Sequence, residues 1–154
     1  MNKLSTAIIA LLLLVIAAGA YKFTSPTDII QSTDGRTAIP LKAEERDLVL
    51  AEMRGFLQAV QQINTGISKD DMKMVAEAAK KMGAAAKNEV PSTLAAKLPM
   101  DFKKLAFDTH KKFDQLALDA KDLEDGMQSL SQVATLMENC VACHKAFRFD
   151  VSVK

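Results

Sequence analysis

Two cysteines and a histidine near the C-terminus are the residues best placed to do chemistry. Cys140 and Cys143 are the only cysteines in the chain, and His144 follows directly. Because three and four residues are close to one helical turn, a helix would bring all three side chains onto one narrow face. Two thiols there can add to the vinyl groups of one porphyrin edge, and the imidazole can reach the iron from the same side. The spacing therefore predicts covalent attachment of one haem c.

Three other uses of the cysteine pair fit this sequence less well. A zinc site needs about four ligands, and outside the motif only His110 and scattered carboxylates are available. A redox-active thiol pair belongs at a helix N-terminus, where the dipole lowers a thiol pKa, whereas these cysteines lie near the end of a predicted helix. A disulfide between residues three apart would close a very short loop and stabilise little.

The first 20 residues read as a targeting segment rather than as part of the fold. Met1 to Lys3 give a positive start, an apolar run follows over 7–20, and Ala18-Gly19-Ala20 offers a cleavage site for signal peptidase. Residues 4–21 are also nearly long enough to span a bilayer, so an uncleaved membrane anchor is the alternative. Either reading predicts export, which places the domain in the periplasm, soluble or tethered to the outer face of the inner membrane.

Charge and composition exclude several classes of function. The 20 basic and 19 acidic residues leave a net charge of +1, spread without a basic stripe, so nucleic acid is not an expected partner. There is no paired carboxylate site, no nucleophile with a base and no phosphate loop, so the chain is not expected to be an enzyme. Tryptophan is absent and Gly and Pro are few, which favours helices over strands.

Residues 42–154 are expected to form the folded domain, with residues 21–41 as a tether. Ser25-Pro26 and Asp34-Gly35 are turn or extended signals without a sustained period, and no strand is predicted anywhere. In the domain, apolar residues recur at three- and four-residue spacing in four stretches, which is typical of amphipathic helices. Four such helices joined by short loops bury their stripes most simply as an antiparallel bundle, so the expected fold class is all-α.

Breaks in the pattern give the expected helix boundaries. The first helix begins near Leu41 and ends at Gly66 and Ser68, and Ser68 with Asp71 gives a capping-box start to the second, which Pro91 closes.

A connection with one turn around 94–97 precedes the third helix, and Gly126 separates it from the fourth. The expected inward positions of the first helix are Leu50, Met53, Leu57, Val60 and Ile63 (or Asn64), and those of the second are Val75, Ala78, Ala79, Met82 and Ala86. The third helix is expected to turn Phe102, Leu105, Ala106, Thr109, Phe113, Leu116 and Ala120 inward. The fourth is expected to do so with Leu130, Val133, Met137, Cys140, His144 and Phe147.

A four-helix domain with its C-x-x-C-H motif on the last helix resembles the cytochrome c′ class, or class II c-type cytochromes. The motif of that family commonly runs on to an aromatic residue and arginine, as Phe147 and Arg148 do here. The resemblance covers roughly residues 42–149. It implies that Cys140 and Cys143 hold the haem by thioethers and that His144 is the proximal iron ligand.

The resemblance also implies roles for three further positions. Arg148 would lie one turn beyond the histidine, near the proximal face of the haem. Met53, on the first helix, would be the sixth ligand in a low-spin member, although core filling is the alternative reading of this methionine. Family members commonly carry an arginine one turn before the distal residue, where this chain has Val49. Arg46 or Arg54 could serve the haem propionates instead.

Other candidate residues have ordinary structural explanations. His110 lies at the edge of the third stripe and is read as a boundary residue rather than an iron ligand. Phe102, Phe107 and Phe113 are read as packing residues. The pairs Lys103-Lys104 and Lys111-Lys112 are expected to form a solvated face that could also steer an acidic redox partner.

Three functions remain open from the sequence. The first is one-electron transfer between redox partner proteins, motivated by the haem motif and Met53. The second is a gas-binding cytochrome, in which five-coordinate iron takes nitric oxide or carbon monoxide. The third is a haem-free helical interaction module with structural cysteines. The resemblance implies a homodimer in addition, formed through the first two helices.

Overall fold

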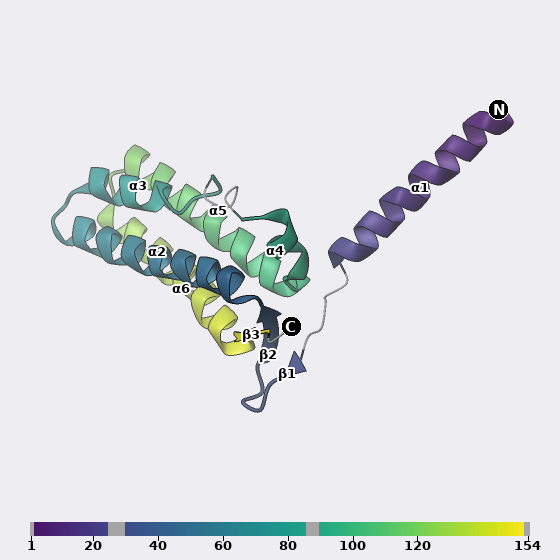
Figure 1. The fold of residues 1–154 in the computed structure, drawn as a ribbon. Helices are drawn as coiled ribbons and strands as arrows, with labels where there is room; N and C mark the ends of the chain where they lie inside the picture. The colour runs from purple at the N-terminus through teal and green to yellow at the C-terminus, as the bar shows by residue number, and fades with distance from the viewer. Residues whose placement is uncertain (1, 25–29, 86–89, 153–154) are drawn as a thin grey trace.

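The structure is a computed structural model that describes residues 2–24, 30–85 and 90–152 (Figure 1). The described chain is mostly helical, as predicted, and it also contains a small sheet, which was not predicted. The elements in chain order are α1 (Lys3–Thr24), β1 (Ile30–Gln31), β2 (Thr37–Leu41), α2 (Ala43–Ser68), α3 (Met72–Lys80), α4 (Ser92–Lys97), α5 (Met100–Asp122), α6 (Gly126–Ala146) and β3 (Phe147–Val151).

Helix α1 is the apolar N-terminal segment. Its stretch Lys3–Tyr21 is long and apolar enough to cross a membrane, and none of that stretch is buried in the protein. A signal sequence passes the same test. An N-terminal apolar helix is therefore present, as the sequence predicts, and length and composition fit both a signal and an anchor.

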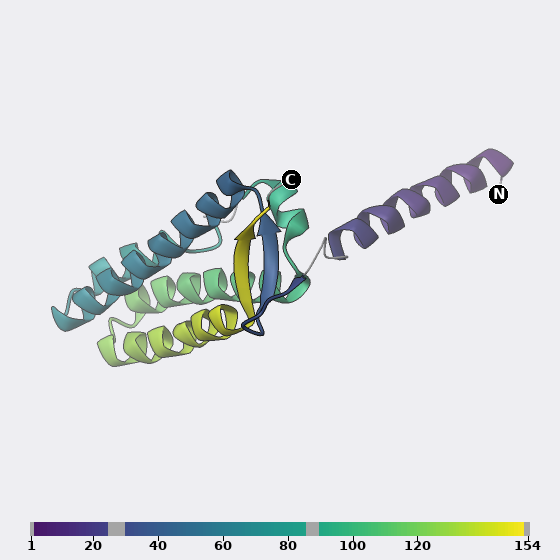
Figure 2. The same ribbon diagram turned by 60° about the horizontal axis from the view of Figure 1, so that its bottom comes forward.

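The prediction that the chain holds no strand is wrong. β1 pairs antiparallel with β2, and β2 pairs in parallel with β3, so that Leu41 lies opposite Val151 (Figure 2). The signals are weak because β1 has two residues and β2 contains Pro40. The sheet is held by burial, since Ala38, Ile39 and Leu41 are at most 2% exposed. Residues 30–41, expected to belong to a tether, are thus part of the folded domain.

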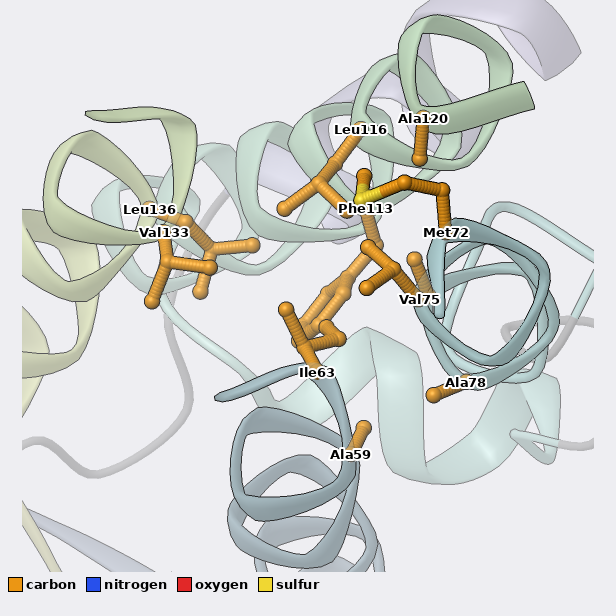
Figure 3. Close-up of a cluster of buried hydrophobic side chains, with 11 residues drawn as sticks. Ala59, Ile63, Met72, Val75, Ala78, Phe113, Leu116, Ala120, Val133 and Leu136 are labelled. Carbon is orange, nitrogen blue, oxygen red and sulfur yellow. The ribbon is translucent and has the colours of Figure 1, made fainter. Parts of the chain in front are cut away.

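Four helices make the main core. α2 packs against α3 and α6, and α5 packs against the same two helices. Figure 3 shows the buried side chains that they share. This main core contains Ala59, Ile63, Met72, Val75, Ala78, Ala79, Phe113, Leu116, Ala120, Val133 and Leu136.

A second buried cluster lies at the sheet end of the domain. It joins the short helix α4, which confirms the turn expected around 94–97, to β2 and to the first turns of α2 and α5. Its buried members are Ile39, Leu41, Val49, Leu94, Leu98 and Phe102, and Met53, Cys143, Phe147 and Phe149 pack against it. We call it the sheet-end cluster.

Several helix boundaries differ from the sequence prediction. The cap of α3 is Asp71, whose side chain accepts a hydrogen bond from the Met74 amide, whereas Ser68 is still helical. α3 ends at Lys80, before Met82, and the expected inward residue Ala86 lies outside the described residues. α6 ends at Ala146, so that Phe147 and Arg148 lie on β3 rather than on the helix.

Some expected inward positions face solvent. Leu57 is 72% exposed, and Leu130, Met137 and His144 are exposed as well. The prediction holds at Ile63 and Val133, which are buried, but the buried faces also include Val49 and Ala59 on α2 and Leu136 and Asn139 on α6, which were not predicted. This happens because the apolar stripes are wider than the buried faces.

The lysine prediction is wrong at one position. Lys103 was expected on a solvated face but is only 4% exposed. Burial lowers the pKa of its ammonium group, because desolvation disfavours the charged form.

Candidate functional site

Cys140, Cys143 and His144 occupy the last two turns of α6. The helix is fixed at its start by Asp125, whose carboxylate accepts hydrogen bonds from the amides of Met127 and Gln128. Cys140 packs against the main core and Cys143 against the sheet-end cluster, while His144 is exposed. Neither cysteine is in a disulfide.

A pocket opens beside the end of α6, with a volume of about 190 Å³. It brings together residues from the β1–β2 loop, from α2, from α5 and from both sides of the α6–β3 junction. The lining residues are Arg36, Arg46, Leu50, Met53, Phe102, Cys143, His144, Phe147, Arg148 and Phe149.

Two of the predicted distal and proximal residues line this same pocket. Met53 lies on the α2 wall next to Leu50, and His144 lies on the α6 wall. The two come from segments 91 residues apart in the chain, and α2 and α6 are in contact. The pocket therefore has a thioether on one wall and an imidazole on another.

Three phenylalanines line the pocket. The Phe102 ring on α5 makes edge-to-face contacts with Phe147 and Phe149 on β3, with ring centroids 5.6 and 5.5 Å apart. Such pairs are stabilised by the opposite signs of ring face and ring edge. Alternation along β3 sends both phenylalanines to one side of the strand, toward the pocket.

Three arginines from three elements meet at the pocket: Arg36, Arg46 and Arg148. Asp34 joins two of them, since its Oδ2 lies 2.6 Å from Arg36 Nη2 and 3.5 Å from Arg148 Nη1. Arg148 Nη2 also lies 2.8 Å from Asp150 Oδ1. The hydrogen bonds from Arg36 and Ser32 hold the pKa of Asp34 well below its usual range. This network ties the β1–β2 loop to β3.

The thiols are not poised as reactive thiolates. Burial raises the pKa of Cys140, and burial together with the nearby Cys140 raises the pKa of Cys143 to about 11. A thioredoxin-type pair needs the opposite shift. Within the described ranges, no group of three or more His, Cys, Asp and Glu residues could hold a metal ion.

His110 is buried away from this pocket. Its Nδ1 lies 2.8 Å from the carbonyl oxygen of Met82, its Nε2 lies 3.4 Å from Glu52 Oε1, and its ring packs on Phe56 with centroids 5.3 Å apart. These contacts match the structural role that the sequence suggests for it.

Two pocket residues have no counterpart in the sequence prediction, Arg36 and Phe149. Arg36 falls in the segment read as a tether, and Phe149 falls beyond the predicted end of the last helix. The alternation of Phe147 and Phe149 was the one available strand signal. Arg54, considered for the haem propionates, is exposed and does not line the pocket, whereas Arg46 does.

No protein-family model, no curated protein and no solved structure matches this chain.

Proposed function

We propose that this chain is an exported monohaem c-type cytochrome of the cytochrome c′ class and that it carries single electrons between redox partner proteins. One observation carries the proposal: Cys143 and His144 of the C-x-x-C-H motif line the same pocket as Met53. A motif match alone could be accidental, but an accidental match has no reason to border a pocket with a thioether on another wall.

The residues present suit a haem in three respects. Cys140 and Cys143 supply the two thiols for covalent attachment, and His144 supplies the proximal imidazole. The three arginines at the pocket suit the two propionate carboxylates, because guanidinium groups bind carboxylates in a bidentate manner. A porphyrin needs more room than about 190 Å³, so the half-buried side chains of β3 would have to shift when it binds.

Each group has a distinct task in this proposal. A bound haem would supply reversible one-electron iron chemistry. As an iron ligand, the Met53 thioether would favour the reduced form and so raise the reduction potential. Phe102, Phe147 and Phe149 would form the apolar side of the site, and Arg148, paired with Asp34 and Asp150, would lie in the same pocket as the histidine.

The proposal extends to the architecture and the location. We infer that α2, α3, α5 and α6 are the four helices of an antiparallel bundle, with α3 much the shortest at nine residues. The apolar α1 takes the chain through a membrane, so the domain works in the periplasm. The chain acts as a carrier rather than as an enzyme.

An absorption spectrum of the purified ferric and ferrous protein, with and without carbon monoxide, tests the proposal. We expect covalent haem c and a sharp low-spin α band in the reduced form. Absence of covalent haem after expression with a working maturation system would overturn it and leave the haem-free interaction module.

A gas-binding cytochrome is the second candidate. It is favoured by the apolar side chains of Leu50 and Phe102, which line the same pocket as Met53 and would suit a small uncharged ligand such as nitric oxide or carbon monoxide. Ready binding of carbon monoxide to the ferrous protein, unchanged in Met53→Leu, would favour this function over electron transfer.

A further inference from the structure

Residues 30–41 follow the N-terminal helix after a short connection and include part of the wall of the pocket. Ala38, Ile39 and Leu41 of β2 are buried, and Arg36 in the preceding loop lines the pocket. Asp34 in the same loop pairs with Arg148 of β3. The segment expected to be a free tether is therefore bound into the domain as far back as β1, at Ile30.

Helix α1 is suited to stay in the membrane. It has 22 residues, which at 1.5 Å each give about 33 Å, against a hydrocarbon core of about 30 Å. It runs without interruption through Ala18-Gly19-Ala20, where a signal peptide would be cut. Lys3 and Lys22 flank the uncharged stretch on its two sides, as they do in membrane-spanning helices.

The chain between anchor and domain is short. Six residue steps separate Thr24 from Ile30, and they can cover roughly 20 Å at full extension. α2 has 26 residues, is therefore about 39 Å long, and leads from the sheet end of the domain to its far end at Ser68 (Figure 1). The connection is thus about half as long as the domain. The sheet end must stay close to the membrane while the far end is free to point away.

We propose that α1 anchors the protein and holds the pocket at the membrane surface, so that the haem serves a redox protein embedded in the same membrane. This rests on the proposed function and adds the kind of partner. The rim of the pocket carries ion-paired side chains, since Arg36 and Arg148 pair there with Asp34 and Asp150, and such a rim suits the polar surface of a protein outside the bilayer better than an apolar lipid-soluble carrier. A partner that diffuses freely through the compartment would have to enter the narrow space between pocket and membrane.

Energy transfer to labelled lipid tests the orientation. Full-length holoprotein is placed in phosphatidylcholine–phosphatidylglycerol vesicles that contain a small fraction of headgroup-labelled acceptor lipid. The donor dye sits on Thr33→Cys, in the exposed β1–β2 loop, or on Ser68→Cys, exposed at the far end of α2. Each donor is compared with and without acceptor, which removes any quenching by haem. We expect several-fold greater transfer from position 33, and equal or reversed transfer would overturn the proposal.

Matched variants separate this inference from the haem assignment. The same two labels in a chain with Cys140→Ala and Cys143→Ala measure orientation in protein that cannot hold haem c. If position 33 still shows greater energy transfer than position 68 in this variant, and the parent chain proves to lack haem, the orientation is supported and the assignment as a cytochrome is rejected. Insertion of 20 Gly/Ser residues after Thr24 should abolish the contrast, whereas the same insertion after Lys154 should preserve it. A contrast unaffected by the first insertion would contradict the short connection.

Electron exchange between copies of the protein tests the partner. Reduced protein on one population of vesicles is mixed with oxidised protein on another, and the exchange is followed in the visible spectrum. We expect slow exchange across vesicles, at least tenfold faster exchange after the insertion following Thr24, and fast exchange between copies in one membrane. Fast exchange between vesicles carrying the parent chain would show that the pocket is open to partners away from its own membrane.

Discussion

Met53 is the residue on which the choice between electron transfer and gas binding depends. It lines the pocket with His144, and it packs against the sheet-end cluster. In the proposed cytochrome its thioether would be the sixth iron ligand, so its removal would leave that position open. In Met53→Leu we expect loss of the low-spin ferrous band, a lower reduction potential and stronger binding of carbon monoxide, measured by visible spectroscopy and redox titration.

A methionine elsewhere provides the control. Met127 is 74% exposed on the first turn of α6, at the opposite end of that helix from Cys143 and His144. Met127→Leu should therefore leave the spectrum and the reduction potential unchanged. An unaltered spectrum in Met53→Leu would mean that Met53 only fills space.

Asp34 shows how a single carboxylate holds the pocket rim together. It pairs with Arg36 and Arg148 and accepts the backbone amide of Arg36. Asp34→Asn should loosen the β1–β2 loop, seen as faster amide hydrogen exchange at Thr37 and Ala38 with little change in α5. Because the pKa of Asp34 is held well below its usual range, stability from this carboxylate is present above that usual range and is lost only as pH falls through the lowered value.

Position Glu44 supplies a comparison for that experiment. It is an exposed acidic residue outside the Asp34 network, so Glu44→Gln should leave loop exchange unchanged. Equal exchange in both variants would contradict a role for Asp34 in closing the rim.

At this scale the sequence was sufficient for the residues whose chemistry depends on local spacing. Cys140, Cys143 and His144 could be grouped because a helix turn is the same everywhere. Arg36 could not, because it reaches the pocket only through a pairing between strands that lie 110 residues apart.

The contact between α2 and α3 depends on a glycine. A Cβ on Gly66 would lie 2.7 Å from Val75 Cγ2 and 3.0 Å from the Asp71 carbonyl oxygen, which is backbone and cannot easily move. Gly66→Ala should therefore destabilise the fold by about 1–3 kcal/mol, measured by urea unfolding.

Gly55 in the same helix is the matched control. A Cβ there meets only the flexible end of Met82, at 3.3 Å. Relief of glycine's poor helix propensity should keep Gly55→Ala within about 1 kcal/mol of the parent chain. If both variants lose equal stability, close approach at Gly66 is not the cause.

The first turn of α2 is joined to α4 by an ion pair. Lys97 Nζ lies 2.6 Å from Glu45 Oε1, and Glu45 Oε2 also accepts the amide of Lys42 at 3.0 Å. Lys97 and the Lys42 amide lower the pKa of Glu45 below 4.5. The stability it contributes is therefore complete above about pH 4.5 and is lost as pH falls through the lowered value.

Replacing that carboxylate should remove both the stability and its pH dependence. For Glu45→Gln we expect a loss of about 0.5–1 kcal/mol at neutral pH that disappears in acid, measured by urea unfolding at several pH values. A loss that is the same at all pH values would point to packing rather than charge.

The existence of the helices could be predicted from the sequence, but the residues at which they begin and end could not. Four amphipathic stretches are visible because each buries one stripe, but the exact face depends on neighbours, as exposed Leu57 shows. Helix stability differs by only a few tenths of a kcal/mol between alternative N-cap residues such as Asp71 and Ser68, so tertiary contacts decide which of them caps the helix. β3 is a strand because it pairs with β2, which lies between β1 and β3 in the sheet.

The two buried clusters divide the molecule into a structural half and a site half. The main core is made by α2, α3, α5 and α6, while the sheet-end cluster shares Met53, Cys143, Phe147 and Phe149 with the pocket. Without haem, in the chain with Cys140→Ala and Cys143→Ala, we expect faster hydrogen exchange in β2, β3 and α4. The middle of α5 should remain protected.

Hydrogen exchange in the sheet end and in α5 is measured in the same sample, so α5 serves as the internal control. Uniform loss of protection along the chain would mean that haem supports the whole fold rather than the sheet end.

The parallel pairing of β2 with β3 also bears on the order of folding and haem attachment in the proposed cytochrome. β3 is synthesised more than 100 residues after β2, and it begins directly after α6, the helix that carries the C-x-x-C-H motif. Closing a loop of more than 100 residues is entropically costly, so this pairing comes late in folding. Until it forms, the pocket lacks the wall made by Phe147 and Phe149, and in the proposed cytochrome Cys143 would be more open to haem attachment. In the proposed cytochrome, haem attachment would therefore have to precede the pairing of β3 with β2, because folding that is faster than attachment would block entry of the cofactor.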